Sequence, residues 1–321
     1  MKYLWAFSTT AMIVACSEPP KPLPPVEPLP PNSFAFGVFG DGPYEPREVA
    51  RFRRVLEDVN RADLQWLLHV GDILWYPCSD SAFADRLAAM NTIERAVIYT
   101  PGDNEWADCY TYKEGRYDPL DRLASLRRIF FSRPTQSLGR HPIPLESQAQ
   151  DSAFAEFPEN ARWTHGGLVF ATVHVVGSSN AGEPFRSRTA ANDAEVARRT
   201  RAAIIWLDQA FARARVTSAK GVVLALHGDM GLEERSGPGR AYAAFVERLK
   251  SNVADFRGPV LLIHGGSHIQ RVDHPLTDGA GRAYPNFTRL ETFGSPEIGW
   301  VRVVVDTLAG RITGYEARLM R

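Results

Sequence analysis

Short apolar runs in this chain alternate with longer segments of helical spacing, and the first three runs each lead into a turn that carries an aspartate. These runs lie at 34–39, 64–70 and 96–100. The segments between them are 46–62 and 82–93, and in 46–62 the apolar residues recur at spacings of three and four, as in a helix with one buried face. Such alternation is typical of parallel βαβ units. We therefore expect an α/β fold.

The rest of the chain continues this alternation around a less regular middle section, 133–160, which is expected to be rich in loops. Further helices are expected at 119–131, 193–215 and 242–249, and further strands at 168–176, 222–226, 260–263, 289–293, 300–306 and 311–316. With 321 residues, of which 44% are apolar, the chain can bury a large core. Its 37 basic and 37 acidic residues cancel, so the charge balance indicates no nucleic-acid partner.

The N-terminus has the pattern of an export signal rather than of a folded element. The apolar stretch within residues 1–15 is too short to span a bilayer, which needs about 20 residues. It ends in Ile13-Val14-Ala15-Cys16, which resembles the lipobox of bacterial lipoproteins. The resemblance implies a lipid anchor at Cys16 and a place in the bacterial cell envelope. By resemblance to the lipoproteins of Gram-negative bacteria, Ser17 after the cysteine favours the outer membrane, facing the periplasm. A chance cysteine after an ordinary signal peptide is the alternative.

A proline-rich stretch follows the candidate lipidation site. Half of residues 17–32 are proline, so this stretch is expected to extend as a semi-rigid spacer at about 3.1 Å per residue. Together with Cys16 it would form a linker at 16–32, and the folded domain is expected at 33–321.

Two further cysteines, Cys78 and Cys109, lie at matching places in the chain. Each follows an aspartate, Asp72 or Asp103, by six residues. Export to an oxidising compartment makes a disulfide between them the default expectation.

Polar residues that suit metal ions follow five of the expected strands. They are Asp41, Asp72, Asp103 with Asn104, His227, and His264 with His268. In open α/β sheets ligands gather outside the carboxyl ends of the strands, so these side chains are expected to share one crevice. Mixed oxygen and nitrogen donors suit Mn, Fe or Zn better than Mg or Ca. Two such ions about 3.5–4 Å apart can activate a phosphoryl group and an attacking water.

The order of these residues resembles that of the calcineurin-like metallophosphoesterases. That family's motifs are Asp-x-His, Gly-Asp, Gly-Asn-His-Asp/Glu, a lone His and Gly-His-x-His. Gly71-Asp72 matches the second motif, Asp41 matches the first aspartate, and His227 and His268 match the fourth motif and the last histidine. The resemblance covers most of the mature chain. It implies an α/β/β/α sandwich of two mixed sheets flanked by helices, and two divalent metal ions bridged by Asp72.

The departures from these motifs are as informative as the matches. Pro43 stands where the first motif has a ligand histidine, and Gly266 stands where the fifth has its first histidine. His264, two positions earlier, could substitute in part. In Gly102-Asp103-Asn104-Glu105, Asp103 takes the place of the ligand asparagine and Asn104 that of the catalytic histidine; alternatively Asn104 itself is the ligand. A diverged branch of the family is expected.

The leading hypothesis is a metal-dependent phosphoesterase of the envelope that hydrolyses a phosphate ester by means of a metal-bound hydroxide. Asn104 or His227 would hydrogen-bond the phosphoryl oxygens. Because the usual proton donor is replaced, substrates with good leaving groups or with a proton donor of their own are favoured. The alternative is a catalytically degenerate scaffold lipoprotein that binds a ligand or partner, which the replacements at Pro43 and Gly266 support. A serine hydrolase is disfavoured because no Gly-x-Ser-x-Gly motif is present.

Overall fold

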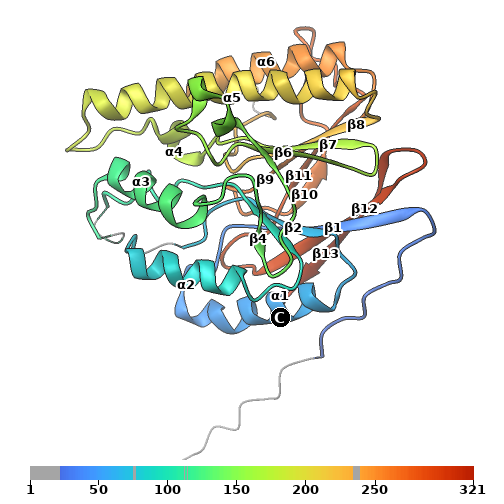
Figure 1. Ribbon diagram of the computed structural model, residues 1–321, viewed down its shortest axis with the longest axis horizontal. Coiled ribbons are helices and arrows are strands. Elements are labelled where there is room, and N and C mark those ends of the chain that lie inside the picture. Colours follow the sequence, from blue (N-terminus) through green and yellow to red (C-terminus); the bar gives the residue numbers. More distant parts are fainter. Residues whose placement is uncertain (1–21, 75–76, 112, 114, 234–238) are drawn as a thin grey trace, which may run out of the picture.

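The computed structural model shows two mixed β-sheets stacked between two layers of helices (Figure 1). It describes residues 22–321 except 75–76, 112, 114 and 234–238. The predicted signal segment at 1–15 and the lipidation site at Cys16 lie outside the described residues. None of the described helices is both long and apolar enough to cross a membrane.

The first sheet contains the three strands that precede the Gly-Asp turns. Its order is β13-β12-β1-β2-β3-β4. The bounds are β1 (Ser33–Phe39), β2 (Trp66–His69), β3 (Ala96–Tyr99), β4 (Leu138–Gly139), β12 (Gly299–Asp306) and β13 (Arg311–Leu319). Strands β1, β2 and β3 pair in parallel, whereas β4, β12 and β13 are antiparallel to their neighbours. The carboxyl ends of the three parallel strands therefore meet at one edge.

The second sheet contains the strands that lead to the histidines. Its order is β10-β11-β9-β8-β7-β6-β5. The bounds are β5 (Glu146–Ser147), β6 (Ala161–His165), β7 (Leu168–Thr172), β8 (Gly221–Ala225), β9 (Val260–His264), β10 (Arg271–Asp273) and β11 (Phe287–Glu291). Strands β7, β8, β9 and β11 run in parallel, so their carboxyl ends also share one edge.

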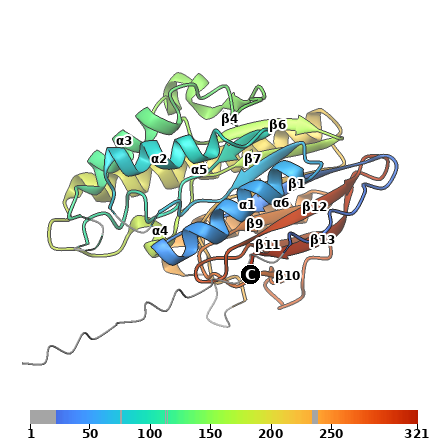
Figure 2. The same ribbon diagram turned by 90° about the horizontal axis from the view of Figure 1, so that it is seen from below.

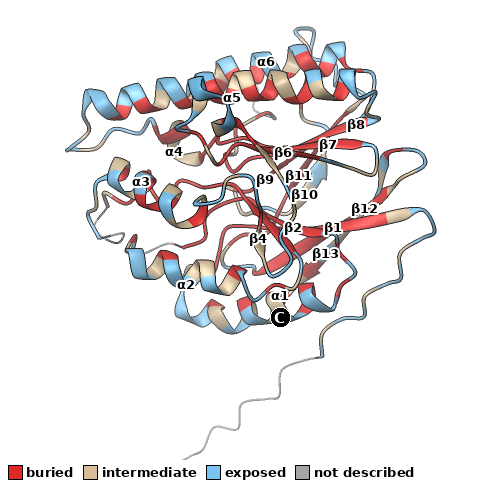
Figure 3. Cartoon of the chain, in the orientation of Figure 1, coloured by how far each residue is buried: buried red, intermediate tan, exposed pale blue. Residues whose placement is uncertain are grey.

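Helices cover the outer face of each sheet, and Figure 1 shows them on opposite sides of the two sheets. Figure 2, seen from below, shows α1 in front of the strands. The helices are α1 (Val49–Arg61), α2 (Asp80–Met90) and α3 (Pro119–Phe130) on the first sheet, and α5 (Ala190–Val216) and α6 (Ala243–Asp255) on the second. Three apolar clusters result, one under each helical layer and one between the sheets. Figure 3 shows the central strands buried and the outward helix faces exposed. The four-layer fold expected from the sequence is confirmed.

The predicted long helices and central strands are all present, with ends shifted by a few residues. Among the described strands and α-helices, five were not predicted: β4, β5, β6, β10 and the short helix α4 (Gly177–Ala181). β4 and β5 are two residues long, so neither could show a periodic pattern. The section 133–160 is loop-rich, as expected, and carries only these two short strands and single-turn 3₁₀ helices among its described elements.

The described part of the proline-rich stretch, 22–32, packs on the domain, whereas the sequence predicted a free spacer. Leu23, Val26 and Leu29 are half-buried against the cluster under the first helical layer. Their spacing of three matches the turn of a polyproline II helix, which places them on one face. The guanidinium of Arg318 donates to the carbonyl oxygens of Pro24 and Pro25 at 3.0 and 2.9 Å. We call residues 22–32 the strap.

Candidate metal centre

The site lies where the carboxyl ends of the two sheets face each other, and its first part is a pair of Gly-Asp turns. Asp41 and Asp72 each have a left-handed backbone, with φ of 53° and 54°, which turns the chain sharply after the strand. The turns are bonded together, because the Asp41 N–H donates to Gly71 O at 3.1 Å and the Gly42 N–H to Asp72 O at 3.0 Å. A Cβ atom on Gly102 would overlap the Asp72 carboxylate, so the loop after β3 can approach only with glycine there.

Carboxylates and imidazoles converge in this crevice. Ligand atoms of Asp41, Asp72 and His227 all lie within 4.8 Å of one another. The Nε2 atom of His227 is 2.9 Å from Asp103 Oδ1 and 3.4 Å from Asp72 Oδ1. The Nε2 atom of His268 is 3.5 Å from Asp41 Oδ1. The structure thus brings together five of the predicted ligands.

Both histidines are oriented by a backbone carbonyl. His227 Nδ1 lies 2.8 Å from Val70 O, and His268 Nδ1 lies 2.7 Å from Ser295 O. A hydrogen bond to a carbonyl makes Nδ1 the protonated nitrogen, so Nε2 is left to face the carboxylates. Metal-ligating histidines commonly show this arrangement, in which the other ring nitrogen donates to a carbonyl or carboxylate.

Burial of several carboxylates close together makes their ionised forms unfavourable. Burial raises the pKa of Asp41 to about 6, even though His227 and His268 lower it. Burial also raises the pKa of Asp72 well above its usual range, and Asp103 adds to this effect. Among the described residues, no group hydrogen-bonds the buried Asp41 Oδ2 atom. A divalent cation would offset these charges and occupy that oxygen, so the donor set fits a metal ion.

Two further residues hold Asp72 in place. The Glu105 carboxylate accepts from the Asp72 N–H at 3.1 Å, from the Gly102 N–H at 2.8 Å and from the Tyr99 hydroxyl at 2.6 Å. An orienting role for Glu105 follows from these bonds. The Tyr44 hydroxyl donates to Asp72 Oδ2 at 2.7 Å. Sequence reasoning missed Tyr44, whose only signal is its place just after the Asp41-Gly42-Pro43 turn.

Asn104 and His264 occupy different places relative to this group. Asn104 lines the cavity in front of the carboxylates. His264 does not line it; its Nδ1 lies 2.7 Å from Gly265 O, and burial lowers its pKa despite the neighbouring Glu291. The structure therefore does not bring His264 to the other predicted ligands.

An open cavity of about 610 Å³ lies in front of the site. Its described lining includes Tyr44, Asn104, Ser178, Asp229 and Tyr242. Five carboxylates line it (Asp72, Asp103, Asp108, Glu183 and Asp229), and no lysine or arginine does among the described residues. An anionic substrate would therefore need cations at the carboxylates in order to bind.

One wall of the cavity is a left-handed turn that the sequence did not predict. Within α4, residues Ser178, Ser179 and Asn180 have φ between 48° and 55°, a conformation that costs roughly 1–2 kcal/mol per residue. The Ser178 hydroxyl lies 2.8 Å from carboxylate oxygens of both Asp103 and Asp108. The buried Arg199 holds the turn through the Asn180 carbonyl at 2.9 Å. Strain maintained by buried bonds is a mark of functional sites.

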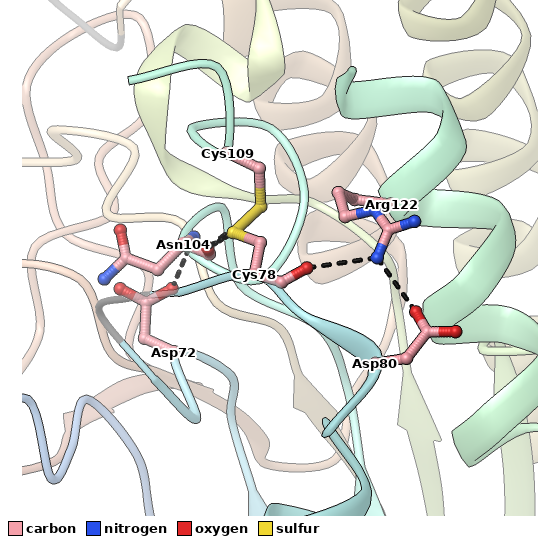
Figure 4. The surroundings of a disulfide bond; sticks show 6 residues. All are labelled: Asp72, Cys78, Asp80, Asn104, Cys109 and Arg122. Carbon is pink, nitrogen blue, oxygen red and sulfur yellow. Dashed lines mark hydrogen bonds and ion pairs between the residues drawn. A yellow bond between two sulfur atoms is a disulfide. The ribbon is translucent and has the colours of Figure 1, made fainter. Parts of the chain in front are cut away.

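The predicted disulfide between Cys78 and Cys109 is present. It joins the loops after β2 and β3, its Cα atoms are 5.8 Å apart, and both cysteines are fully buried (Figure 4).

No protein-family model matches this chain, and no curated protein shows significant sequence similarity to it. Among solved structures, a proposed 5′-nucleotidase from Staphylococcus aureus is 12% identical with a TM-score of 0.47. The match covers 90% of this chain and 54% of the nucleotidase, so the chain spans about half the length of that protein. A phosphatase from Mycoplasma pneumoniae is 11% identical with a TM-score of 0.45, over 90% of this chain and 93% of the phosphatase. With two mixed sheets between two helical layers, the chain is an α/β/β/α sandwich, the fold that the sequence resemblance implied.

Proposed function

We propose that this chain is a metal-dependent phosphoesterase that binds two divalent cations of the Mn, Fe or Zn type at the ends of its parallel strands. The observation that carries the proposal is the convergence of three buried carboxylates, Asp41, Asp72 and Asp103, with the Nε2 atoms of His227 and His268. These donors come from five separate loops, and an oxygen–nitrogen mixture of this kind suits those metals.

The donors divide into two sets that share Asp72. We assign Asp41 and its neighbour His268 to one set and Asp103 and its neighbour His227 to the other, and ligand atoms of Asp72 lie within 4.8 Å of those of Asp41 and His227. Each set lacks one ligand of the motifs that the sequence resembles, at Pro43 and at Gly266 respectively. When bound, divalent cations supply Lewis-acid activation of the phosphoryl group and of the attacking water.

The protein's own contribution is to orient the phosphoryl group. The Asn104 amide lines the cavity, and its Nδ2 atom is buried with no hydrogen-bond partner among the described residues. It would donate to a phosphoryl oxygen and gain strength as charge develops there. Substrates with good leaving groups are favoured, because Asn104 stands where the resemblance places a proton-donating histidine and cannot itself supply a proton.

We further propose that the chain is anchored at Cys16 to the bacterial envelope, facing the periplasm. The lipobox-like Ile13-Val14-Ala15-Cys16 supports this placement, and so does the disulfide, which is typical of oxidising compartments.

The test is hydrolysis of aryl phosphomonoesters and diesters by residues 17–321 with added Mn²⁺. We expect turnover above the metal-only background and a loss of at least about 100-fold in Asp72→Asn, because the shared carboxylate is removed. Glu156→Gln, which breaks only the exposed ion pair to Arg198, is the matched control and should retain full activity. If the wild type and Asp72→Asn both stay at background, the phosphoesterase proposal fails and the scaffold alternative gains support.

A further inference from the structure

The disulfide lies directly behind the residue proposed to contact the phosphoryl group. The Asn104 carbonyl oxygen is 3.3 Å from Cys78 Sγ and 3.5 Å from Cys109 Sγ. On its other side, the Asn104 N–H donates to Asp72 Oδ1 at 3.1 Å. Figure 4 shows the Asn104 side chain extending away from the disulfide. The backbone of Asn104 is thus confined between the disulfide and Asp72, and its side-chain amide points away from the disulfide.

The carboxylates of the site do not depend on the disulfide in the same way. Asp103 is held by its side-chain contacts with His227 and Ser178, and its carbonyl accepts from the Trp106 and Asp108 N–H groups. Asp72 is held by Tyr44 and Glu105. In contrast, no N–H group in the described part of the chain donates to the Asn104 carbonyl. Removing the disulfide should therefore loosen Asn104, while Asp72 keeps Tyr44 and Glu105 and Asp103 keeps His227 and Ser178.

A second contact fixes the disulfide from the side of α3. Arg122 Nη1 donates to the Cys78 carbonyl at 3.1 Å and pairs with Asp80 Oδ1 at 2.9 Å (Figure 4). Arg128 pairs with the same aspartate at 2.8 Å. Both arginines therefore pair with Asp80, and Arg122 in addition donates to the Cys78 carbonyl.

We infer that the Cys78–Cys109 disulfide is a positioning element for Asn104, which it holds so that the side-chain amide can donate to the phosphoryl group. The inference rests on the proposed function. It assigns the disulfide a role in the chemical step, whereas a disulfide that only stabilises the fold would leave the rate per folded molecule unchanged.

A double-mutant cycle tests this role. Four proteins are compared: the wild type, Cys78→Ala/Cys109→Ala, Asn104→Ala, and the combination of all three substitutions. With an aryl phosphate and Mn²⁺, we expect kcat to fall at least about tenfold in the cysteine variant and about 100-fold in Asn104→Ala. Bound metal should match the wild type in all four. The combination should be no slower than Asn104→Ala alone, because the disulfide acts through that residue. Losses that multiply, an unchanged kcat in the cysteine variant, or loss of metal from it would each overturn the inference.

Arg122→Ala provides a second test in case the cysteine variant does not fold. It removes the hydrogen bond to the Cys78 carbonyl but leaves the disulfide in place. We expect it to lower kcat about threefold in the wild type and to have no effect in Asn104→Ala. Arg128→Ala is the matched control, since it removes a pairing to Asp80 without touching Cys78. Equal losses in the two arginine variants would contradict a positioning role.

Binding of inorganic phosphate to the Mn²⁺-loaded protein separates this inference from the proposed function. Calorimetry should show about tenfold weaker binding for the cysteine variant and for Asn104→Ala, without a further loss when they are combined. If this pattern appears in a protein that hydrolyses nothing, the phosphoesterase proposal fails and the positioning role stands. If phosphate binding is absent, or the losses multiply, the positioning role fails.

Discussion

Glu159 is the residue on which a buried charge network behind the cavity depends. Its carboxylate accepts two bonds from Arg127, at 2.6 and 3.1 Å, and lies 2.7 Å from His174 Nδ1. Burial alone would raise the pKa of Glu159, but Arg127 and His174 lower it to about 2. Burial also lowers the pKa of His174, so that this histidine is neutral and donates to Glu159. The network therefore needs an ionised Glu159.

Glu159→Gln should destabilise the protein by about 3 kcal/mol at pH 7, because it leaves the partly buried Arg127 without its counter-charge. The carboxylate contributes stability above its unfolded pKa, near 4.5, and loses it as the pH falls toward 2. The difference in the free energy of unfolding between wild type and variant should thus be roughly 2 kcal/mol smaller at pH 3 than at pH 7. Urea unfolding at both pH values checks this, with the exposed Glu156→Gln as control, which should cost less than about 1 kcal/mol. A gap that does not change with pH would contradict the assignment.

At the scale of single residues, the sequence shows which proposed ligands directly follow apolar strands. Asp41, Asp72 and Asp103 could be found because each ends a parallel strand, and parallel strands deliver their ends to one edge. Successive side chains of a strand point to opposite faces of the sheet. A shift of one residue in the predicted strand therefore reverses the direction of His264, and its place could not be predicted. Ser178 could not be predicted either, because its role comes from a left-handed turn with no periodic signal.

The strap is the element on which structure and sequence differ most. Its prolines exclude a helix, as expected, but the apolar residues at every third position bind it to the domain. Its carbonyls also receive bonds from Arg318 and Arg302. A chain that begins at residue 33 should therefore be less stable than one that begins at residue 22. We expect its free energy of unfolding, measured with denaturant, to be lower by about 2 kcal/mol or more. Equal stabilities would show that the strap is a spacer after all.

Other elements were predictable in proportion to their length. Helix α5 and strands β1, β8 and β12 carry enough residues to show a period, and each was placed within a few residues. The strands β4 and β5 exist because neighbouring strands offer them free edges, which is a tertiary cause that no local pattern records. The expected α/β architecture did not depend on them.

At the scale of the whole molecule, stacking of the two sheets is what creates the site. Three carboxylates come from the first sheet, and His227 and His268 come from loops of the second. Neither sheet alone holds a complete set of donors, and the disulfide fixes the loops of the first sheet where they face the second. The sandwich therefore brings together groups that repel one another unless a cation lies between them.

The metal content of protein purified without chelators tests directly whether the crevice between the two sheets is a metal centre. Residues 17–321 should carry one to two equivalents of Mn, Fe or Zn per chain, and Asp72→Asn should lose most of it, because Asp72 belongs to both sets of donors. Glu156→Gln should keep the wild-type content. A wild-type protein that holds no stoichiometric metal, even after incubation with Mn²⁺, Fe²⁺ or Zn²⁺, would contradict the central claim.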